Sequence, residues 1–207
     1  APGAVVSNTG TISTGDSSVG MYGESTATNY TLANSGNITV GKKGAGIYIG
    51  SGNVTVTGGT ISIGEESTAL SMNMTPVGGT SYTYSGTGGI INVNGQKVTG
   101  YSLTGLDNMT TPSLFTDNLT VSVGSTPANA GEKYTQYNLL NSKFIANKNM
   151  TFSKDGFTYI NAKNSAVELA SGTTVSSTGL NSVGIYLDND TLASPITAFS
   201  GTYSLKN

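Results

Sequence analysis

Residues 36–49 read Gly-Asn-Ile-Thr-Val-Gly-Lys-Lys-Gly-Ala-Gly-Ile-Tyr-Ile. The stretch contains two short alternating segments, 37–40 and 45–49, joined by a turn that begins and ends with glycine. Ile38 and Val40 share one face of the first segment, which is the period of a β-strand rather than that of a helix. Each segment therefore has one apolar face, and it is too short to bury that face alone.

The same phrase recurs along the chain. Gly-Thr-Ile-Ser at 10–13 is followed by Val-Gly-Met-Tyr at 19–22, and Gly-Thr-Ile-Ser at 59–62 by Thr-Ala-Leu-Ser at 68–71. A looser copy begins at Ser171 and ends in Val-Gly-Ile-Tyr at 183–186. The second segment follows the first by the same number of residues in the first three copies, whereas the interval between copies varies. A repeat of this kind indicates stacked coils with turns of variable length.

Stacking the copies about 4.8 Å apart would align their apolar residues in columns. One column would contain Ile12, Ile38 and Ile61, and another Met21, Ile47 and Leu70. The copies are spaced 23 to 26 residues apart. A coil of this length accommodates three strands of about five residues and three tight turns made of Gly, Asn, Asp and Ser. The leucine-rich pattern and the Gly-Gly-x-Gly-x-Asp calcium pattern are both missing from the sequence. The sequence therefore predicts an all-β parallel β-helix.

The regularity of the repeat divides the chain into three zones of one continuous solenoid. Residues 1–73 form regular coils, and residues 149–207 resume them. In residues 74–148 the repeat fades, and two alternatives remain: degenerate coils with long loops, or a small inserted subdomain. Residues 131–141 are the one stretch compatible with a helical turn.

Composition excludes several kinds of active site. The 207 residues include no His, Cys, Arg or Trp. Serine-histidine and cysteine-histidine nucleophile systems, zinc sites with His or Cys ligands, and arginine clamps on phosphate are therefore ruled out. We expect no catalytic residue, no cofactor and no metal site.

The charge balance points away from polyanions and from membrane-spanning helices. Nine lysines oppose eleven acidic residues, for a net charge of −2, and no basic stripe is present. Nucleic-acid binding therefore has no electrostatic basis, and no apolar run is long enough for a spanning helix. The absence of cysteine, the low charge and the Thr/Asn-rich strands are typical of an exported bacterial protein.

Two further features could have functional meaning. Tyr22, Tyr48 and Tyr186 occupy equivalent outward positions and are candidate partner contacts; alternatively they steady the sheet by cross-strand stacking. Eight Asn-x-Thr sequences could accept glycans, or could arise by chance where Thr and Asn are abundant: they begin at Asn29, Asn37, Asn53, Asn73, Asn108, Asn118, Asn149 and Asn189.

The recurring phrase Gly-x-Ile-Thr/Ser-Val/Ile-Gly followed by Val/Ala-Gly-Ile-Tyr resembles the repeats of type V autotransporter passenger domains from Gram-negative bacteria. The resemblance covers residues 8–72 well and 150–190 loosely. It implies a right-handed parallel β-helix that is carried through an outer-membrane barrel and displayed on the cell surface. The sequence shows neither a signal peptide nor that C-terminal barrel, so we expect a monomeric segment of a longer passenger.

The resemblance implies a non-catalytic adhesin that binds a host-cell or bacterial surface protein or glycan. The loops of 74–148 would provide the contact surface, because binding residues usually lie on loops of a rigid scaffold. One alternative is a polysaccharide-active β-helix lyase or hydrolase, for which Asp107, Asp117, Asp155 and Lys154 are the available groups. The other alternative is a structural stalk spacer.

Overall fold

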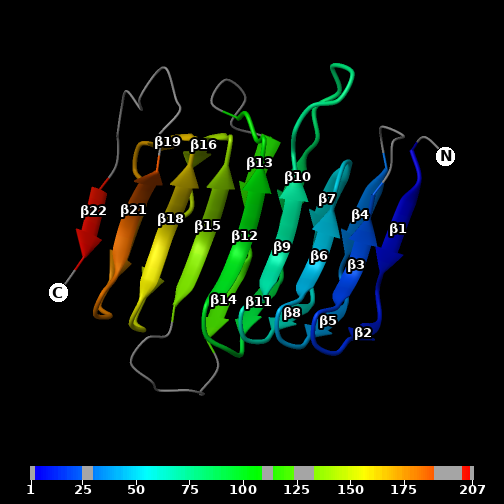
Figure 1. Cartoon of the computed structure of the whole chain (residues 1–207), viewed down its shortest axis with the longest axis horizontal. Helices are drawn as coiled ribbons and strands as arrows, with labels where there is room; N and C mark the ends of the chain where they lie inside the picture. The colour runs from blue at the N-terminus through cyan, green and yellow to red at the C-terminus, as the bar shows by residue number, and fades with distance from the viewer. Residues whose placement is uncertain (1–2, 25–29, 109–113, 124–132, 189–201, 206–207) are drawn as a thin grey trace.

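The computed structural model describes residues 3–24, 30–108, 114–123 and 133–188, and the backbone of 202–205. Over these residues the chain is a parallel β-solenoid of about six turns with three strands in each coil (Figure 1). The parallel β-helix predicted from the repeat is therefore confirmed. None of the described residues belongs to a helix with the length and hydropathy needed to cross a membrane.

Each coil contributes one strand to each of three sheets, here named A, B and C. Sheet A contains β1 (Val5–Asn8), β4 (Thr31–Asn34), β7 (Asn53–Val56), β10 (Tyr84–Gly86) and β13 (Phe115–Asp117). Sheet B contains β2 (Thr11–Ser13), β5 (Asn37–Val40), β8 (Thr60–Ile63), β11 (Ile90–Val93) and β14 (Thr120–Val123). Sheet C contains β3 (Val19–Gly23), β6 (Ala45–Ile49), β9 (Thr68–Asn73), β12 (Val98–Thr104), β15 (Tyr134–Leu140), β18 (Phe157–Lys163) and β21 (Val183–Asp188).

The predicted apolar columns are confirmed by the register. Ile12 pairs with Ile38, and Ile38 with Ile61, in sheet B. In sheet C, the column of the second segments is Met21, Ile47 and Leu70. Ile38 and Ile61 are at most 1% exposed, because each is covered above and below by the next coil. The core is thus built by stacking, as nearest-neighbour coils require.

Sheet C strands contain an extra inward position directly before the core residue. In β6 and β9 this position is held by Gly46 and Ala69, and both are buried together with the residue that follows. A Cβ on Gly46 would lie 2.5 Å from Ile61 Cγ2 and 2.6 Å from the Ala69 carbonyl oxygen, so only a glycine fits there. In β15 the corresponding residue is Gln136, which is fully buried.

Strand β15 also corrects one expectation from the sequence. The helical turn considered for 131–141 is wrong for the described part of that stretch, because Tyr134–Leu140 pairs in parallel with both β12 and β18. Thr135-Gln136-Tyr137-Asn138 occupies the same register as Thr68-Ala69-Leu70-Ser71, two coils earlier. Gln136 stands where earlier coils have Gly46 and Ala69, so the repeat is hard to recognise in the sequence although the strand is kept.

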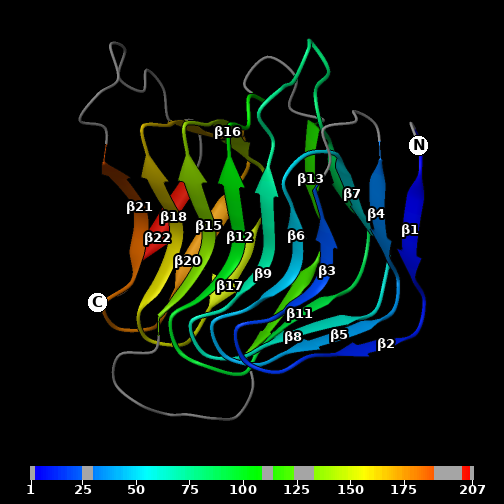
Figure 2. The same ribbon diagram turned by 45° about the vertical axis from the view of Figure 1, so that its right-hand side comes forward.

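Sheets A and B stop at the same level of the solenoid. The strands that follow next, β16 (Lys143–Ala146) and β17 (Met150–Phe152), begin separate sheets with β19 (Ala166–Leu169) and with β20 (Thr174–Ser177) and β22 (Thr202–Leu205). Sheet C crosses this level without a break because β15 pairs with β18, and Figure 2 shows β21, β18, β15, β12 and β9 side by side. The solenoid is therefore continuous in sheet C and interrupted in sheets A and B.

Aromatic residues replace the aliphatic ladder at the interruption. Tyr101 and Phe115 have ring centroids 5.4 Å apart, and Phe115 and Phe144 5.5 Å apart, so rings from both sides of the break touch inside the solenoid. The ring centroids of Tyr137 and Phe144 are 4.8 Å apart. Edge-to-face and tilted arrangements of this kind are the favourable ones. The interior thus remains packed where two of the three sheets end.

Candidate functional site

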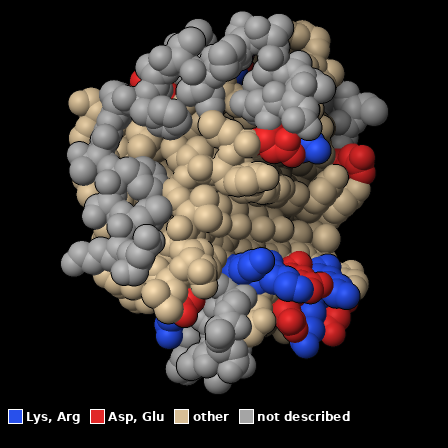
Figure 3. Space-filling view, turned by 60° about the vertical axis from the view of Figure 1, so that its left-hand side comes forward, with Lys and Arg blue, Asp and Glu red and all other residues tan. Residues whose placement is uncertain are grey.

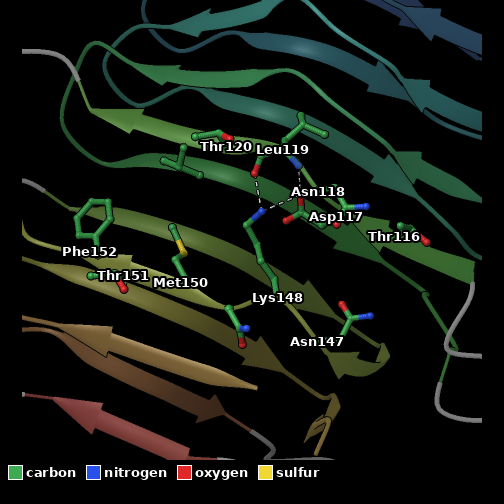
Figure 4. Close-up of a pocket in the computed structure, with 12 residues that line it drawn as sticks. Thr116, Asp117, Asn118, Leu119, Thr120, Asn147, Lys148, Met150, Thr151 and Phe152 are labelled. Carbon is green, nitrogen blue, oxygen red and sulfur yellow. Dashed lines mark hydrogen bonds and ion pairs between the residues drawn. The ribbon is translucent and has the colours of Figure 1, made fainter. Parts of the chain in front are cut away.

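The break in sheets A and B opens to solvent as a cavity of about 530 Å³, which we call the fissure. One wall is formed by β13, β14 and their connection, and the other by β17 and the residues before it (Figure 4). Its lining consists of Thr116, Asp117, Asn118, Leu119, Thr120, Val121, Asn147, Lys148, Asn149, Met150, Thr151 and Phe152. Most of the lining residues have polar side chains. The fissure therefore suits a polar or peptide-like ligand better than an apolar one.

Asp117 lies in the fissure wall and is only 5% exposed. Its Oδ1 accepts hydrogen bonds from Tyr101 Oη at 2.6 Å and from the Leu119 amide at 3.1 Å. Its Oδ2 accepts from Tyr137 Oη at 2.7 Å and from Gln136 Nε2 at 3.0 Å. A buried carboxylate needs such partners, because an unpaired buried charge is very costly. The sequence places Asp117 in the inward series 115, 117, 119, where an apolar residue would be expected.

Lys148 reaches across the fissure from the opposite wall. Its Nζ lies 3.4 Å from Asp117 Oδ1 and donates to the Leu119 carbonyl oxygen, as the dashed lines in Figure 4 show. The side chain is only 12% exposed. Tyr159 Oη donates to the backbone carbonyl of Lys148 at 2.8 Å and helps to fix its position. The ion pair therefore joins the two walls at one point.

The surrounding tyrosines act as hydrogen-bond donors and not as proton-transfer groups. Burial raises the pKa of Tyr101 and Tyr137 well above the usual value, and the negative charge of Asp117 raises the pKa of both further. Tyr84 and Tyr134 show raised pKa values for the same two reasons, in the same order. All four hydroxyls stay protonated at neutral pH. Tyr101 and Tyr137 solvate the carboxylate in place of water, while Tyr84 bonds to the Tyr101 hydroxyl and Tyr134 donates to Gln136 Oε1.

This arrangement stabilises a scaffold better than it supports acid–base chemistry. Both oxygens of Asp117 are already saturated with donors, and Asp117 is the single acidic residue in the described lining. Glycoside hydrolysis commonly uses two carboxylates about 5–9.5 Å apart. The described residues also contain no cluster of three or more His, Cys, Asp or Glu that could hold a metal ion.

The other groups considered for a polysaccharide-active site are not brought to the fissure. Asp107 pairs with Lys143 at 3.4 Å, and both side chains are about half exposed. Asp155 accepts a hydrogen bond from the Leu180 amide at 2.7 Å and thereby ties a turn between coils. Lys154 lies beside Asp155 at a separate, much smaller pocket. The structure therefore separates these residues from Asp117.

The candidate contact tyrosines occupy one outward column of sheet C. Tyr22 and Tyr48 pair directly, and their rings stack at 5.3 Å with an interplanar angle of 6°. Tyr186 is at the far end of the same column and pairs with Asn161. Tyr22 and Tyr186 are more than half exposed. The column between them contains Ser71, Ser102 and a hydrogen-bonded pair, Asn138 and Asn161, so it is not a continuous aromatic row.

Four of the Asn-x-Thr asparagines perform a structural task that the sequence did not reveal. Each uses its side-chain oxygen to accept a backbone N–H from the next coil, at 2.8–3.0 Å: Asn37 from Thr60, Asn53 from Thr83, Asn108 from Ile145 and Asn149 from Thr174. Asn73 caps its own turn, and Asn118 lies in the fissure. Asn29 and Asn189 lie outside the described residues. The recurrence of Asn at these positions of the coils thus has a physical reason.

Charged side chains gather at the turns between sheets B and C. Lys42 pairs with Glu65 at 2.9 Å, and Glu66 pairs with Lys43 at 3.7 Å and with Lys97 at 3.1 Å. Figure 3 shows that charges on the face in view form a few small groups within a largely uncharged surface. These pairs are at least one-third exposed, so each contributes little to stability. Alternating signs also leave no single-sign patch along these described turns.

Comparison of the chain with protein-family models, with curated proteins and with solved structures yields no match. The three-sheet parallel solenoid and its fissure are thus established by the geometry alone, and no family is identified for the chain.

Proposed function

We propose that this chain is the binding segment of an exported bacterial surface protein of the autotransporter-passenger type. Its partner is a host-cell or bacterial surface protein or glycan, and it acts by adhesion and not by catalysis. The observation that carries the proposal is the fissure, a solvent-open cavity on a scaffold whose coils are otherwise stacked strand on strand. Rigid scaffolds with one irregular region typically bind through that region.

A catalytic role on polysaccharide is less well supported by the same site. Asp117 has no oxygen left to accept a substrate proton, and its neighbours are tyrosines with strongly raised pKa values. A purely structural spacer would have no need for a buried ion pair beside an open cavity, since such a pair is rarely a net source of stability. Adhesion therefore accounts for the fissure better than either alternative.

The experiment compares two substitutions in one column of sheet B. Thr120→Arg places a long cation at the fissure wall, whereas Thr11→Arg makes the same change at the far end of the column, four coils away or roughly 19 Å at about 4.8 Å per coil. Purified chain on beads would be tested for retention on epithelial cells and on Gram-negative bacteria, with circular dichroism as the folding control.

Thr120→Arg should reduce retention at least about tenfold, equivalent to about 1.4 kcal/mol, while Thr11→Arg leaves it unchanged. Equal retention by both variants would place the contact elsewhere. No retention of the unchanged chain on any cell would favour the spacer. Release of reducing or unsaturated ends from acidic polysaccharides, with and without calcium, would favour the enzyme.

A further inference from the structure

Two strand edges line the fissure, and no strand of the described residues lies between them. β14 pairs with β11 on one side only, and β17 pairs with β20 on one side only, among the described residues. Both belong to the sheet B face of the solenoid, and both run parallel to their partners. Exposed edges of this kind are templates for an added strand, and natural proteins usually cover them.

The hydrogen-bond pattern identifies which backbone groups point into the fissure. Within a parallel sheet, alternate residues of a strand bond to one neighbour and the intervening residues to the other. The Thr120 amide donates to Gly89 O on the β11 side, so the backbone groups of Val121 face the fissure, and those of Val123 point to the same side at the adjoining small pocket. On the other wall, Phe152 O accepts from Thr178 on the β20 side, so the backbone groups of Thr151 face the fissure.

One end of this open edge is already closed by side chains. Leu119 has the same parity as Val121, so its backbone groups also point into the fissure. Its N–H donates to Asp117 Oδ1, and its carbonyl accepts from Lys148 Nζ. A carboxylate and an ammonium thus satisfy the two groups that a neighbouring strand would satisfy. The Asp117–Lys148 pair marks where the open edge begins, and Val121 and Val123 lie beyond it.

The apolar side chains at the open edge are less buried than those of the neighbouring strand. Ile91 and Val93 in β11 are 0% and 3% exposed, as expected for inward residues covered on both sides. Val121 and Val123, which pair with them in register, are only partly buried. Among the described residues, both valines pack against the core but lack a full covering layer on their outer side. An occupant with apolar side chains facing inward would supply that layer.

We propose that the fissure binds an extended peptide segment of the partner protein as one added parallel strand between β14 and β17. This inference rests on the proposed function and specifies its ligand. The inserted segment has alternating residues: apolar side chains point inward over Val121 and Val123, and small polar ones point outward like Thr120 and Thr151. Backbone hydrogen bonds to both walls provide affinity, and the inward side chains provide selectivity. A glycan cannot satisfy alternating amides and carbonyls on two walls in this way.

Amide hydrogen exchange of the free chain tests whether the edges are open. The amides of Ile91 and Val93, which face β14, should exchange slowly, and those of Val121, Val123 and Thr151 should exchange at least about 100-fold faster. This difference corresponds to about 2.7 kcal/mol in opening free energy. Slow exchange at Val121 in the free chain would overturn the proposal, because the edge would already be occupied.

Binding is tested with a synthetic probe that has the required pattern. The peptide Gly-Ile-Ile-Asn-Val-Asn-Gly copies residues 89–95, the strand that already covers β14 on its other side. The control peptide has the same sequence with alternate amides N-methylated, which removes donors but keeps the side chains. The probe should bind the full chain and protect Val121 and Thr151 from exchange. The control should bind at least about tenfold more weakly.

Variants of the chain test whether the peptide probe binds at the open edge of β14. Val121→Pro removes an amide that faces the fissure, whereas Val121→Ile keeps it. Only the proline variant should fail to bind the peptide probe. Thr151→Pro tests the opposite wall independently if Val121→Pro does not fold. Equal affinity for both peptides, or no binding at about 1 mM, would overturn the strand proposal. Cell retention lost with Thr120→Arg would still support adhesion in that case, so the two proposals fail separately.

Discussion

Asp117 should contribute strongly to the stability of the solenoid, although it is charged. The substitution Asp117→Asn keeps the shape but replaces one acceptor oxygen by a donor. Oδ1 serves Tyr101, the Leu119 amide and Lys148, and Oδ2 serves Tyr137 and Gln136, so neither position suits an NH₂ group. Whichever way the amide is turned, at least two donors face another donor.

The magnitude follows from these contacts. Hydrogen bonds to a buried charged group contribute about 1.5–3 kcal/mol each, and an orphaned buried donor costs about 1–3 kcal/mol. Tyrosine hydroxyls can rotate toward other acceptors, and Tyr101 already lies 3.0 Å from Tyr84 Oη, so part of the loss is recovered. We expect Asp117→Asn to lower the free energy of unfolding by about 3 kcal/mol. Removal of one partner of a buried ion pair typically costs about 3–5 kcal/mol, which is consistent with this value.

The assay is urea unfolding followed by circular dichroism, with hydrogen exchange to locate the effect. Asp107→Asn provides the matched control, because Asp107 also pairs with a lysine at 3.4 Å but is about half exposed; its substitution should change stability by less than about 0.5 kcal/mol. Asp117→Asn should also speed exchange in β13, β14 and β15 before it affects β3 or β6. If Asp117→Asn and Asp107→Asn differ by less than about 1 kcal/mol, the reasoning that Asp117 organises the interruption is refuted.

Three further predictions concern other parts of the fold. The raised pKa values of the four buried tyrosines favour the protonated folded state, so this stability is fully present below pH 10 and is lost as the pH rises above it. Titration at 295 nm should show these tyrosines ionising together with loss of the β-sheet spectrum and not before. Gly46→Ala should lower the free energy of unfolding by about 1–3 kcal/mol through overpacking. Gly10→Ala, where no atom lies within 4 Å of the added Cβ, should change it by less than about 0.5 kcal/mol. Asn53→Ala removes the acceptor of the Thr83 amide and should cost about 0.5–1.5 kcal/mol by urea unfolding, with no change in mass from a lost glycan.

The regular coils could be predicted because the same alternation of apolar and polar residues recurs in several copies. Ile38 and Val40 alternate with polar residues, and so do Ile61 and Ile63 one coil later. A register shift by one residue would turn every apolar side chain outward, so the pattern specifies the pairing strongly. The columns in sheets B and C followed directly from it.

The later coils were harder to predict because larger residues replace the glycine of the repeat. Gln136 takes the position held by Gly46, and Tyr137 the position held by Ile47. Tyr137 is accommodated by packing against Phe144 and Tyr159. Gln136 finds partners in Asp117 and Tyr134, so its burial is satisfied. The substitution and the space that receives it lie on different strands, which a local pattern does not show.

The fissure itself was not predicted, although the sequence contains its signal. Asp117 continues the inward alternation of Phe115, and Lys148 that of Phe144 and Ala146. A charged residue at an inward position of a strand requires a partner of opposite charge. The two residues are 31 positions apart, close to the length of one coil of this solenoid with its loops. Two opposite charges at inward positions one coil apart therefore suggest a pair between neighbouring coils.

The interruption also explains why a polar network lies at this level beside the aromatic cluster. Coils of a solenoid are coupled only to their neighbours, so a break in two of three sheets would nearly uncouple β16–β21 from the preceding coils. Strand pairing in sheet C, between β15 and β18, and the short Asp107–Lys143 bridge would then join the two parts. The Asp117 network links sheet A, sheet C and the far wall, through Tyr137 and Lys148, at the point where backbone pairing between the walls is lost. Directional bonds hold the two walls at a defined separation. The buried ion pair thus fixes the geometry on which the proposed binding role of the fissure depends.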